Sequence, residues 1–107
     1  MSGTLEKVQR LAADGQLRIS DHGYDELDND DIFATDILSG LPDAVVIEDY
    51  PDAPKGPSVL VLQRDANGEP VHVVWGIPEG HDSPAVLVTA YRPEPARWTA
   101  DFLVRKK

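Results

Sequence analysis

The chain of 107 residues contains no cysteine. Disulfide bonds, thiolate metal sites and a cysteine nucleophile are therefore excluded. The N-terminal stretch MSGTLEKVQRLAADG lacks an apolar signal core, and no run approaches the roughly eighteen apolar residues that a membrane span requires. We therefore expect a cytoplasmic protein of bacterial type that has no membrane partner.

Positive charge is missing from a long part of the chain. No Lys or Arg occurs between Arg18 and Lys55, whereas eleven acids lie there: Asp21, Asp25, Glu26, Asp28, Asp30, Asp31, Asp36, Asp43, Glu48, Asp49 and Asp52. The formal net charge is -9, so the summed field repels phosphate backbones and disfavours direct nucleic-acid binding. The acidic stretch is either a solvated face or a surface that binds a basic protein partner.

The rest of the composition is that of one globular domain spanning residues 1–107, with 41% hydrophobic and 27% charged residues. Apolar residues at helical spacing predict a first helix over 4–14, with Thr4 as its cap. QLRIS is a short extended stretch. Ser20 is typical of an N-cap, so a second helix carrying His22 and Glu26 follows it.

A third helix is predicted from Asp31 to Ser39, with Ile32, Phe33, Ile37 and Leu38 as its apolar stripe. The pattern then changes to four β-rich runs, AVVIEDY, SVLVLQR, VHVVWGI and AVLVTAY, separated by turn-forming residues. The predicted fold class is therefore α+β, with two or three N-terminal helices followed by a four-stranded, mostly antiparallel sheet. The tail PARWTADFLVR can close as a helix or as an edge strand.

Asn67-Gly68 is a strong hairpin signal between two of these runs. A two-residue turn there places Gln63 opposite His72, and a symmetric PEGHDSP loop places His72 opposite the stretch from Thr89 to Tyr91. A slip of one residue would turn these groups to the other face of the sheet. His72 in the interior of a central strand needs hydrogen-bond partners.

Motifs for metals and cofactors are lacking. The run DELDNDD has neither the glycine nor the glutamate spacing of an EF-hand loop. The three histidines do not have the spacing of a zinc site, and no phosphate-binding glycine loop occurs. We therefore expect neither a metal nor a cofactor.

One set of side chains is suited to acid–base chemistry. His22 and Glu26 are four residues apart on one helix face, so the carboxylate can orient the imidazole. His72 and Tyr91 lie on the sheet, and Arg64 or Arg92 would bind an anionic substrate. The alternative is purely structural, with His22 at a helix start and His72 satisfied within the sheet.

Several blocks in order, ISDHGYDEL, VIEDYP, GPSVLVLQ, PVHVVWG and VTAYRPEPARW, resemble the bacterial family called domain of unknown function 4258. The resemblance covers about residues 19–98, and it aligns His22, His72, Thr89 and Tyr91 with family positions. The family is similar, in its order of helices and strands, to RelE-type toxins, which are metal-independent ribonucleases. Glu26 and Asp30 depart from the family pattern, because many members carry arginine there.

The resemblance implies a toxin-like or degenerate ribonuclease of a toxin–antitoxin system. In that hypothesis His22 and His72 transfer protons, Glu26 orients His22, Tyr91 donates a hydrogen bond, and Arg64 or Arg92 neutralises charge. The competing hypothesis is a non-catalytic acidic domain that binds a basic protein. A third possibility is an enzyme acting on a small substrate other than nucleic acid.

Overall fold

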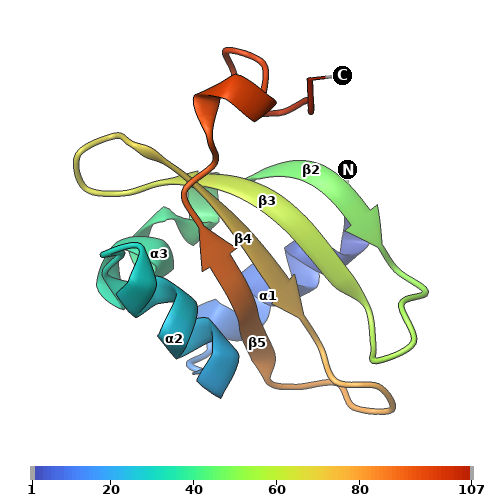
Figure 1. The fold of residues 1–107 in the computed structure, drawn as a ribbon. Coiled ribbons are helices and arrows are strands. Elements are labelled where there is room, and N and C mark those ends of the chain that lie inside the picture. The colour runs from blue at the N-terminus through green and yellow to red at the C-terminus, as the bar shows by residue number, and fades with distance from the viewer. Residues whose placement is uncertain (1, 107) are drawn as a thin grey trace.

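The computed structural model describes residues 2–106, which form one mixed five-stranded sheet with helices on one face (Figure 1). The strand order is β1-β5-β4-β3-β2. The helices are α1 (Gly3–Ala13), α2 (Asp21–Asn29) and α3 (Ala34–Gly40). The strands are β1 (Leu17–Ile19), β2 (Val45–Tyr50), β3 (Ser58–Arg64), β4 (Pro70–Gly76) and β5 (Ala85–Tyr91). Two short 3-10 helices follow α3 and β5, at Leu41–Asp43 and Pro95–Arg97.

The α+β class and all four predicted strands are confirmed, but the sheet has a fifth strand. β1 pairs in parallel with β5, with Leu17 beside Ala85 and Ile19 beside Leu87. The other three pairings are antiparallel. The four-stranded prediction missed β1 because three extended residues gain their sheet character from a partner far along the chain.

The helices cover one face of the sheet and leave the other open. α1 lies against β3, β4 and β5, while α2 packs on β5 and α3 on β3. Figure 1 shows α1 behind the sheet and α2 with α3 at one side. The side chains between the two layers form the apolar core; among them are Leu5, Val8, Leu27, Ile37, Val61, Val73, Trp75 and Leu87. We call the uncovered side the open face.

Two helix starts differ from the predicted ones, whereas that of α2 agrees. The Ser20 hydroxyl accepts from the Gly23 N–H at 2.9 Å, so Ser20 is the N-cap of α2. Ser2, not Thr4, caps α1. α3 begins at Ala34, after an extended Phe33, and the predicted apolar stripe is only half correct. Ile32 and Ile37 are buried, whereas Phe33 is 73% exposed and Leu38 is exposed as well.

The hairpin between β3 and β4 has a longer loop than predicted. Arg64 pairs with Pro70, so the loop is residues 65–69 and Leu62, not Gln63, lies opposite His72. The Asp65 carboxylate accepts from the N–H groups of Asn67 and Glu69, each at 2.9 Å, and this stabilises the wider turn. The one-residue shift turns Gln63 to the core face.

Gln63 is 2% exposed, and both ends of its amide form hydrogen bonds inside the core. Its Nε2 donates to the Ile37 carbonyl at 2.7 Å, and its Oε1 accepts from the Trp75 indole N–H at 2.8 Å. These two bonds link β3 to β4 and to α3. They form because a buried polar group needs a hydrogen-bond partner.

The C-terminal segment folds back over one end of the open face (Figure 1). Trp98 forms an isolated antiparallel bridge with Arg105, and the Thr99 N–H donates to the Val104 carbonyl at 2.8 Å. We call residues 98–105 the C-terminal loop. It is neither the helix nor the edge strand of the sheet that the sequence suggested. Within residues 2–106, no helix has the length and apolar character needed to cross a bilayer.

Candidate functional site

The open face is organised in rows of side chains that run across the strands. Tyr91, His72, Leu62 and Val45 are consecutive register partners on β5, β4, β3 and β2. Because side chains alternate between faces along a strand, all four point to the open face. The C-terminal loop covers His72 in this row, and His72, Tyr91 and the loop together form what we call the histidine corner.

His72 is the centre of the histidine corner and is 0% exposed. Its Nε2 lies 2.8 Å from the Phe102 carbonyl oxygen, and its Nδ1 lies 3.2 Å from the Tyr91 hydroxyl. A carbonyl oxygen only accepts, so Nε2 carries a proton, and in the neutral imidazole Nδ1 then accepts from the Tyr91 hydroxyl. Both ring nitrogens are therefore engaged in one defined tautomer.

Aromatic rings enclose the imidazole of His72. The Trp98 ring meets it edge-on at a centroid distance of 4.3 Å, and the Tyr91 ring does so at 5.3 Å. The Arg105 guanidinium lies 5.1 Å from the Trp98 ring centroid, in cation–π contact. Phe102 takes a left-handed φ of 61°, a conformation that costs free energy in a non-glycine residue. The hydrogen bond to His72 offsets that cost.

The electrostatics of the corner favour neutral side chains. Burial lowers the pKa of His72 and the Arg105 charge adds to this, whereas the hydrogen bond to Phe102 opposes it. Burial also raises the pKa of Tyr91, so its hydroxyl keeps the proton that it donates to His72. A neutral imidazole that already uses both nitrogens is suited to holding the loop in place.

His22 lies on α2, with a side chain that is 65% exposed. Its Nε2 is 3.8 Å from Glu26 Oε1, within ion-pair distance but beyond a hydrogen bond. Among residues 2–106, no hydrogen bond or ring contact joins His22 to His72 or Tyr91. The structure thus brings His72 together with Tyr91, and His22 together with Glu26, as two separate pairs.

The two candidate anion-binding arginines are engaged by the protein itself. Arg92 Nη2 lies 2.9 Å from the Asp65 carboxylate, and the Arg92 N–H donates to Asp30 at 2.9 Å. Burial alone would raise the pKa of Asp65, but hydrogen bonds from Glu69, Arg92 and Asn67 outweigh it and the pKa is lowered. Arg92 Nη1 is buried and has no hydrogen-bond partner among residues 2–106.

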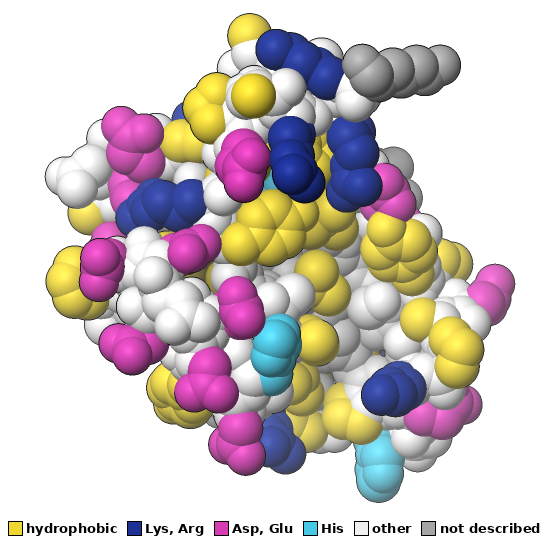
Figure 2. Space-filling model, viewed as in Figure 1, with side chains coloured by type: hydrophobic (Ala, Val, Ile, Leu, Met, Phe, Trp, Pro, Cys, Tyr) yellow, Lys and Arg dark blue, Asp and Glu magenta, His cyan; other side chains and the backbone are white. Residues whose placement is uncertain are grey.

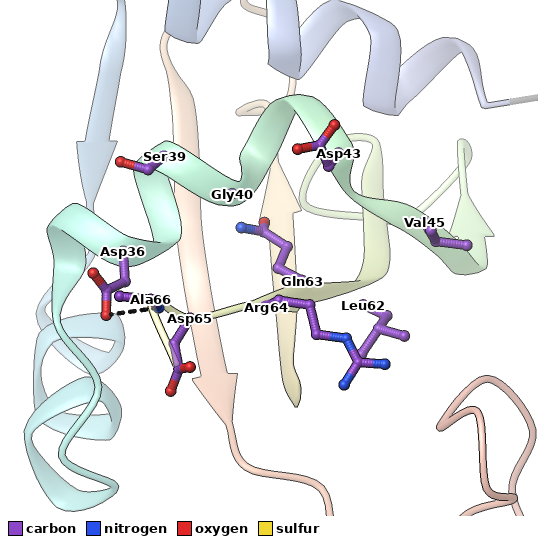
Figure 3. A pocket seen from close by; sticks show the side chains of 10 residues that line it. All are labelled: Asp36, Ser39, Gly40, Asp43, Val45, Leu62, Gln63, Arg64, Asp65 and Ala66. Atoms are coloured by element: carbon purple, nitrogen blue, oxygen red, sulfur yellow. Dashed lines mark hydrogen bonds between the residues drawn. The ribbon is translucent and has the colours of Figure 1, made fainter. Parts of the chain in front are cut away.

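Arg64 lines a hollow of about 570 Å³ beside the β3–β4 loop, and its Nη1 donates to the Gly68 carbonyl at 3.3 Å. Figure 3 shows Gln63 pointing toward Gly40 while Arg64 points the other way. The same hollow is lined by three acids, Asp36, Asp43 and Asp65. Three carboxylates around one guanidinium make this hollow unsuited to phosphate.

Within residues 2–106, no group of three or more His, Asp or Glu side chains is arranged to hold a metal ion. The described site is thus built from hydrogen bonds and ring contacts. Fold and site together define a small α+β domain with an enclosed imidazole on the open face of its sheet.

Residues 19–92, more than half of the chain, match the family described as domain of unknown function (DUF4258), and the chain belongs to this family. The resemblance noted from the sequence is confirmed. No curated protein and no solved structure matches the chain significantly. The match includes His22, His72 and Tyr91 and ends at Arg92, so the C-terminal loop that covers His72 lies beyond it.

Two features of the site were missed by reasoning from sequence. The C-terminal loop closes the histidine corner through the main-chain carbonyl of Phe102, and a main-chain contact leaves no side-chain pattern. Asp65 is the partner of Arg92, and the signal available was its place at a turn, where aspartate favours hydrogen bonds to following N–H groups.

Proposed function

We propose that this chain is a non-catalytic interaction domain that binds a basic protein partner through α2, α3 and the residues joining them. We call this region the acidic helical surface. Figure 2 shows acidic side chains gathered over α2 and α3. The observation that carries the proposal is that acids occupy α2 where the helix itself disfavours them.

Asp21, Asp25 and Asp28 follow one another at spacings of four and three, so their like charges repel on one helix face. Asp28 lies in the last turn, where the helix dipole favours cations and where α2 has none. All three carboxylates are exposed and have no ion pair among residues 2–106. Asp21 lies in the first turn, where the dipole favours an acid, so the unfavourable charge is that of Asp28, with Asp25 between them. A cation supplied from outside would explain an acid that reduces the stability of its own helix.

Exposed apolar side chains accompany these acids. Phe33 is 73% exposed and Tyr24 is 57% exposed, and Leu38 on α3 is exposed too. Aromatic side chains are enriched among the residues that dominate binding energies at protein interfaces. A partner with both cationic and apolar groups, such as an amphipathic helix with a basic face, could therefore bind here. Its cations would contact the acids and its apolar groups would contact the exposed apolar side chains.

The hypothesis of metal-independent RNA cleavage, and with it the likeness to RelE-type toxins, has less support. A proton-transferring imidazole must reach its substrate, whereas His72 is enclosed and uses both nitrogens. Arg92 is paired with Asp65. The interaction proposal expects the purified protein to leave RNA intact at neutral pH, and RNA cleavage lost in His72→Gln would contradict it.

The direct test uses a synthetic helical peptide with leucines on one face and lysines on the other, added to isotope-labelled protein. We expect chemical-shift changes on α2, Phe33 and α3, with an affinity that falls steeply as salt is added. The same peptide with glutamate in place of lysine is expected not to bind. Equal binding of both peptides, or shift changes confined to other elements, would refute the proposal.

Variants make the test specific to the acidic helical surface. Replacing Asp25, Asp28 and Asp31 by Asn removes three exposed acids and is expected to weaken binding about tenfold. The matched control replaces Glu6, Asp14 and Glu69 by their amides, which changes the net charge equally at exposed positions elsewhere. Equal weakening by the control would show a general charge effect without a specific surface.

A further inference from the structure

A second hollow lies on the open face, away from the histidine corner, with a volume of about 620 Å³. Val74, Gly76, Val86 and Val88 form its floor, and residues 53–57 of the β2–β3 connection form a wall. The lining also includes Arg18, and with Lys55 of the wall it supplies two cations. We call this the open-face groove. Figure 2 shows hydrophobic side chains across this side of the sheet, with cationic side chains near its lower edge.

Strand register explains why the sheet is hollow here. Arg18, Val86, Gly76 and Ser58 are consecutive register partners across β1, β5, β4 and β3. Gly76 has no side chain to fill the middle of this row. The register shifts between Val74 and Trp75, and the extra residue of this bulge, Val88, joins the floor of the groove.

The wall is held in place by backbone hydrogen bonds. The Ile77 N–H donates to the Pro57 carbonyl and the Glu79 N–H to the Lys55 carbonyl, each at 3.0 Å. Gly56 has a φ of 116°, and a Cβ there would lie 2.0 Å from the Ile77 carbonyl oxygen. Only glycine allows this approach, so the groove is formed before any ligand arrives and binding avoids the cost of ordering it.

The charge of the groove is opposite to that of the protein. The chain has 19 acids and a formal net charge of -9, yet the groove is lined by two cations and no acid. Neither Arg18 nor Lys55 forms an ion pair within residues 2–106. By contrast, three acids line the hollow beside Arg64, and two acids accompany the three arginines of a further hollow beside the histidine corner.

We propose that the open-face groove binds a small amphiphilic carboxylate. Its apolar body lies on the floor formed by Val74, Gly76, Val86 and Val88, and its carboxylate lies between Arg18 and Lys55. A groove of this size falls in the range of small-molecule sites, which combine apolar walls with a few orienting polar groups. Binding is non-covalent and involves no residue of the acidic helical surface.

The probe is octanoate, added to isotope-labelled full-length protein, with octanol and octylammonium as matched probes of neutral and positive charge. We expect octanoate to shift the amide signals of β4, β5 and the 53–57 wall and to bind at least about tenfold more tightly than octanol, since the charged head group gains hydrogen bonds. Acetate, which lacks the apolar body, is expected to cause no saturable shift there.

Two variants test the two halves of the groove. Gly76→Val places a side chain in the groove at a position where a Cβ meets only ordinary contacts, the shortest at 3.5 Å, so we expect it to fold and to lose octanoate binding. Arg18→Gln is expected to weaken octanoate about tenfold and to leave octanol binding unchanged. Arg10→Gln, an equal charge change at an exposed position of α1, is expected to have no effect.

The proposal is overturned if octanol binds as tightly as octanoate, or if folded Gly76→Val binds octanoate like the parent. The proposal is also overturned if the groove does not bind octanoate and binds only the C-terminus of an extended peptide. The groove would then be a peptide site. Loss of peptide binding by the acidic helical surface would not affect these results, so the two proposals fail independently.

Discussion

His22 and His72 are chemically identical side chains in two contrasting regions of one small domain. His72 is buried under the C-terminal loop with both nitrogens bonded, whereas His22 is exposed on a helix of carboxylates. The difference teaches that the partners of a histidine, not its residue type, indicate its role. His72 links the C-terminal loop to the sheet through its hydrogen bonds with Phe102 and Tyr91. His22 lies on a surface that is available to another molecule.

The largest expected contrast is in stability. His72→Ala leaves a cavity and removes the partners of Tyr91 and Phe102, so we expect a loss of about 3 kcal/mol in the free energy of unfolding. His22→Ala removes an exposed side chain and is expected to change stability by less than about 0.5 kcal/mol. Urea unfolding of both variants measures the contrast, and equal losses would refute it.

Asp65→Ala is expected to cost about 2 kcal/mol, because it removes two turn hydrogen bonds and leaves the guanidinium of Arg92 without its carboxylate. The control is Glu94→Ala, which breaks the exposed ion pair with Arg97 and is expected to be nearly neutral. Urea unfolding at neutral pH checks both. A neutral Asp65→Ala would mean that Arg92 is available to bind a ligand.

The contribution of His72 to the pH dependence of stability can be measured by comparing the parent with His72→Gln. Because its folded pKa is lowered, the unfolded chain binds a proton first as the pH falls below about 6.5. The contribution of His72 is therefore complete above that pH and is lost below it. We expect the parent to lose more stability than His72→Gln between pH 7 and pH 5.5. Parallel curves from urea unfolding at each pH would contradict the neutral imidazole.

The smallest expected effect is a gain. Asp28→Asn removes like-charge repulsion and an unfavourable charge in the last turn of α2, so we expect about 0.5 kcal/mol of added stability. Thermal unfolding at low salt measures it, and the same variant is expected to bind the basic peptide more weakly. Asp14→Asn, at the C-cap of α1, shows whether any acid near a helix end behaves alike. An Asp28→Asn protein that is less stable than the parent would remove the main support for the proposed role of the acidic helical surface.

Much of the fold could be predicted because its signals are local. Ser20 caps α2, and the four β-rich runs are all strands, since capping and alternation act over a few residues. The parts that could not be predicted depend on contacts between distant segments. Gln63 faces the core only because the Asp65 side chain widens the turn, and β1 becomes a strand only by pairing with β5.

In the candidate site, too, local signals could be predicted from the sequence and contacts between distant segments could not. The sequence predicts that His72 lies opposite the stretch from Thr89 to Tyr91, and in the structure its partner is Tyr91. It cannot predict that the Phe102 carbonyl reaches the other nitrogen of His72, because a loop fold-back is not encoded in any short pattern. The spacing assigned Phe33 to a buried stripe, but α3 begins only at Ala34, so Phe33 precedes the helix and is exposed.

The central claim is that His72 is a structural imidazole in one fixed, neutral tautomer. Long-range proton–nitrogen correlation of the labelled imidazole tests it most directly. At pH 7 we predict protonation at Nε2 alone, slow exchange of that proton with solvent, and an unprotonated Nδ1. An imidazolium at that pH, or a rapidly exchanging Nε2 proton, would contradict the account and return His72 to the candidates for catalysis.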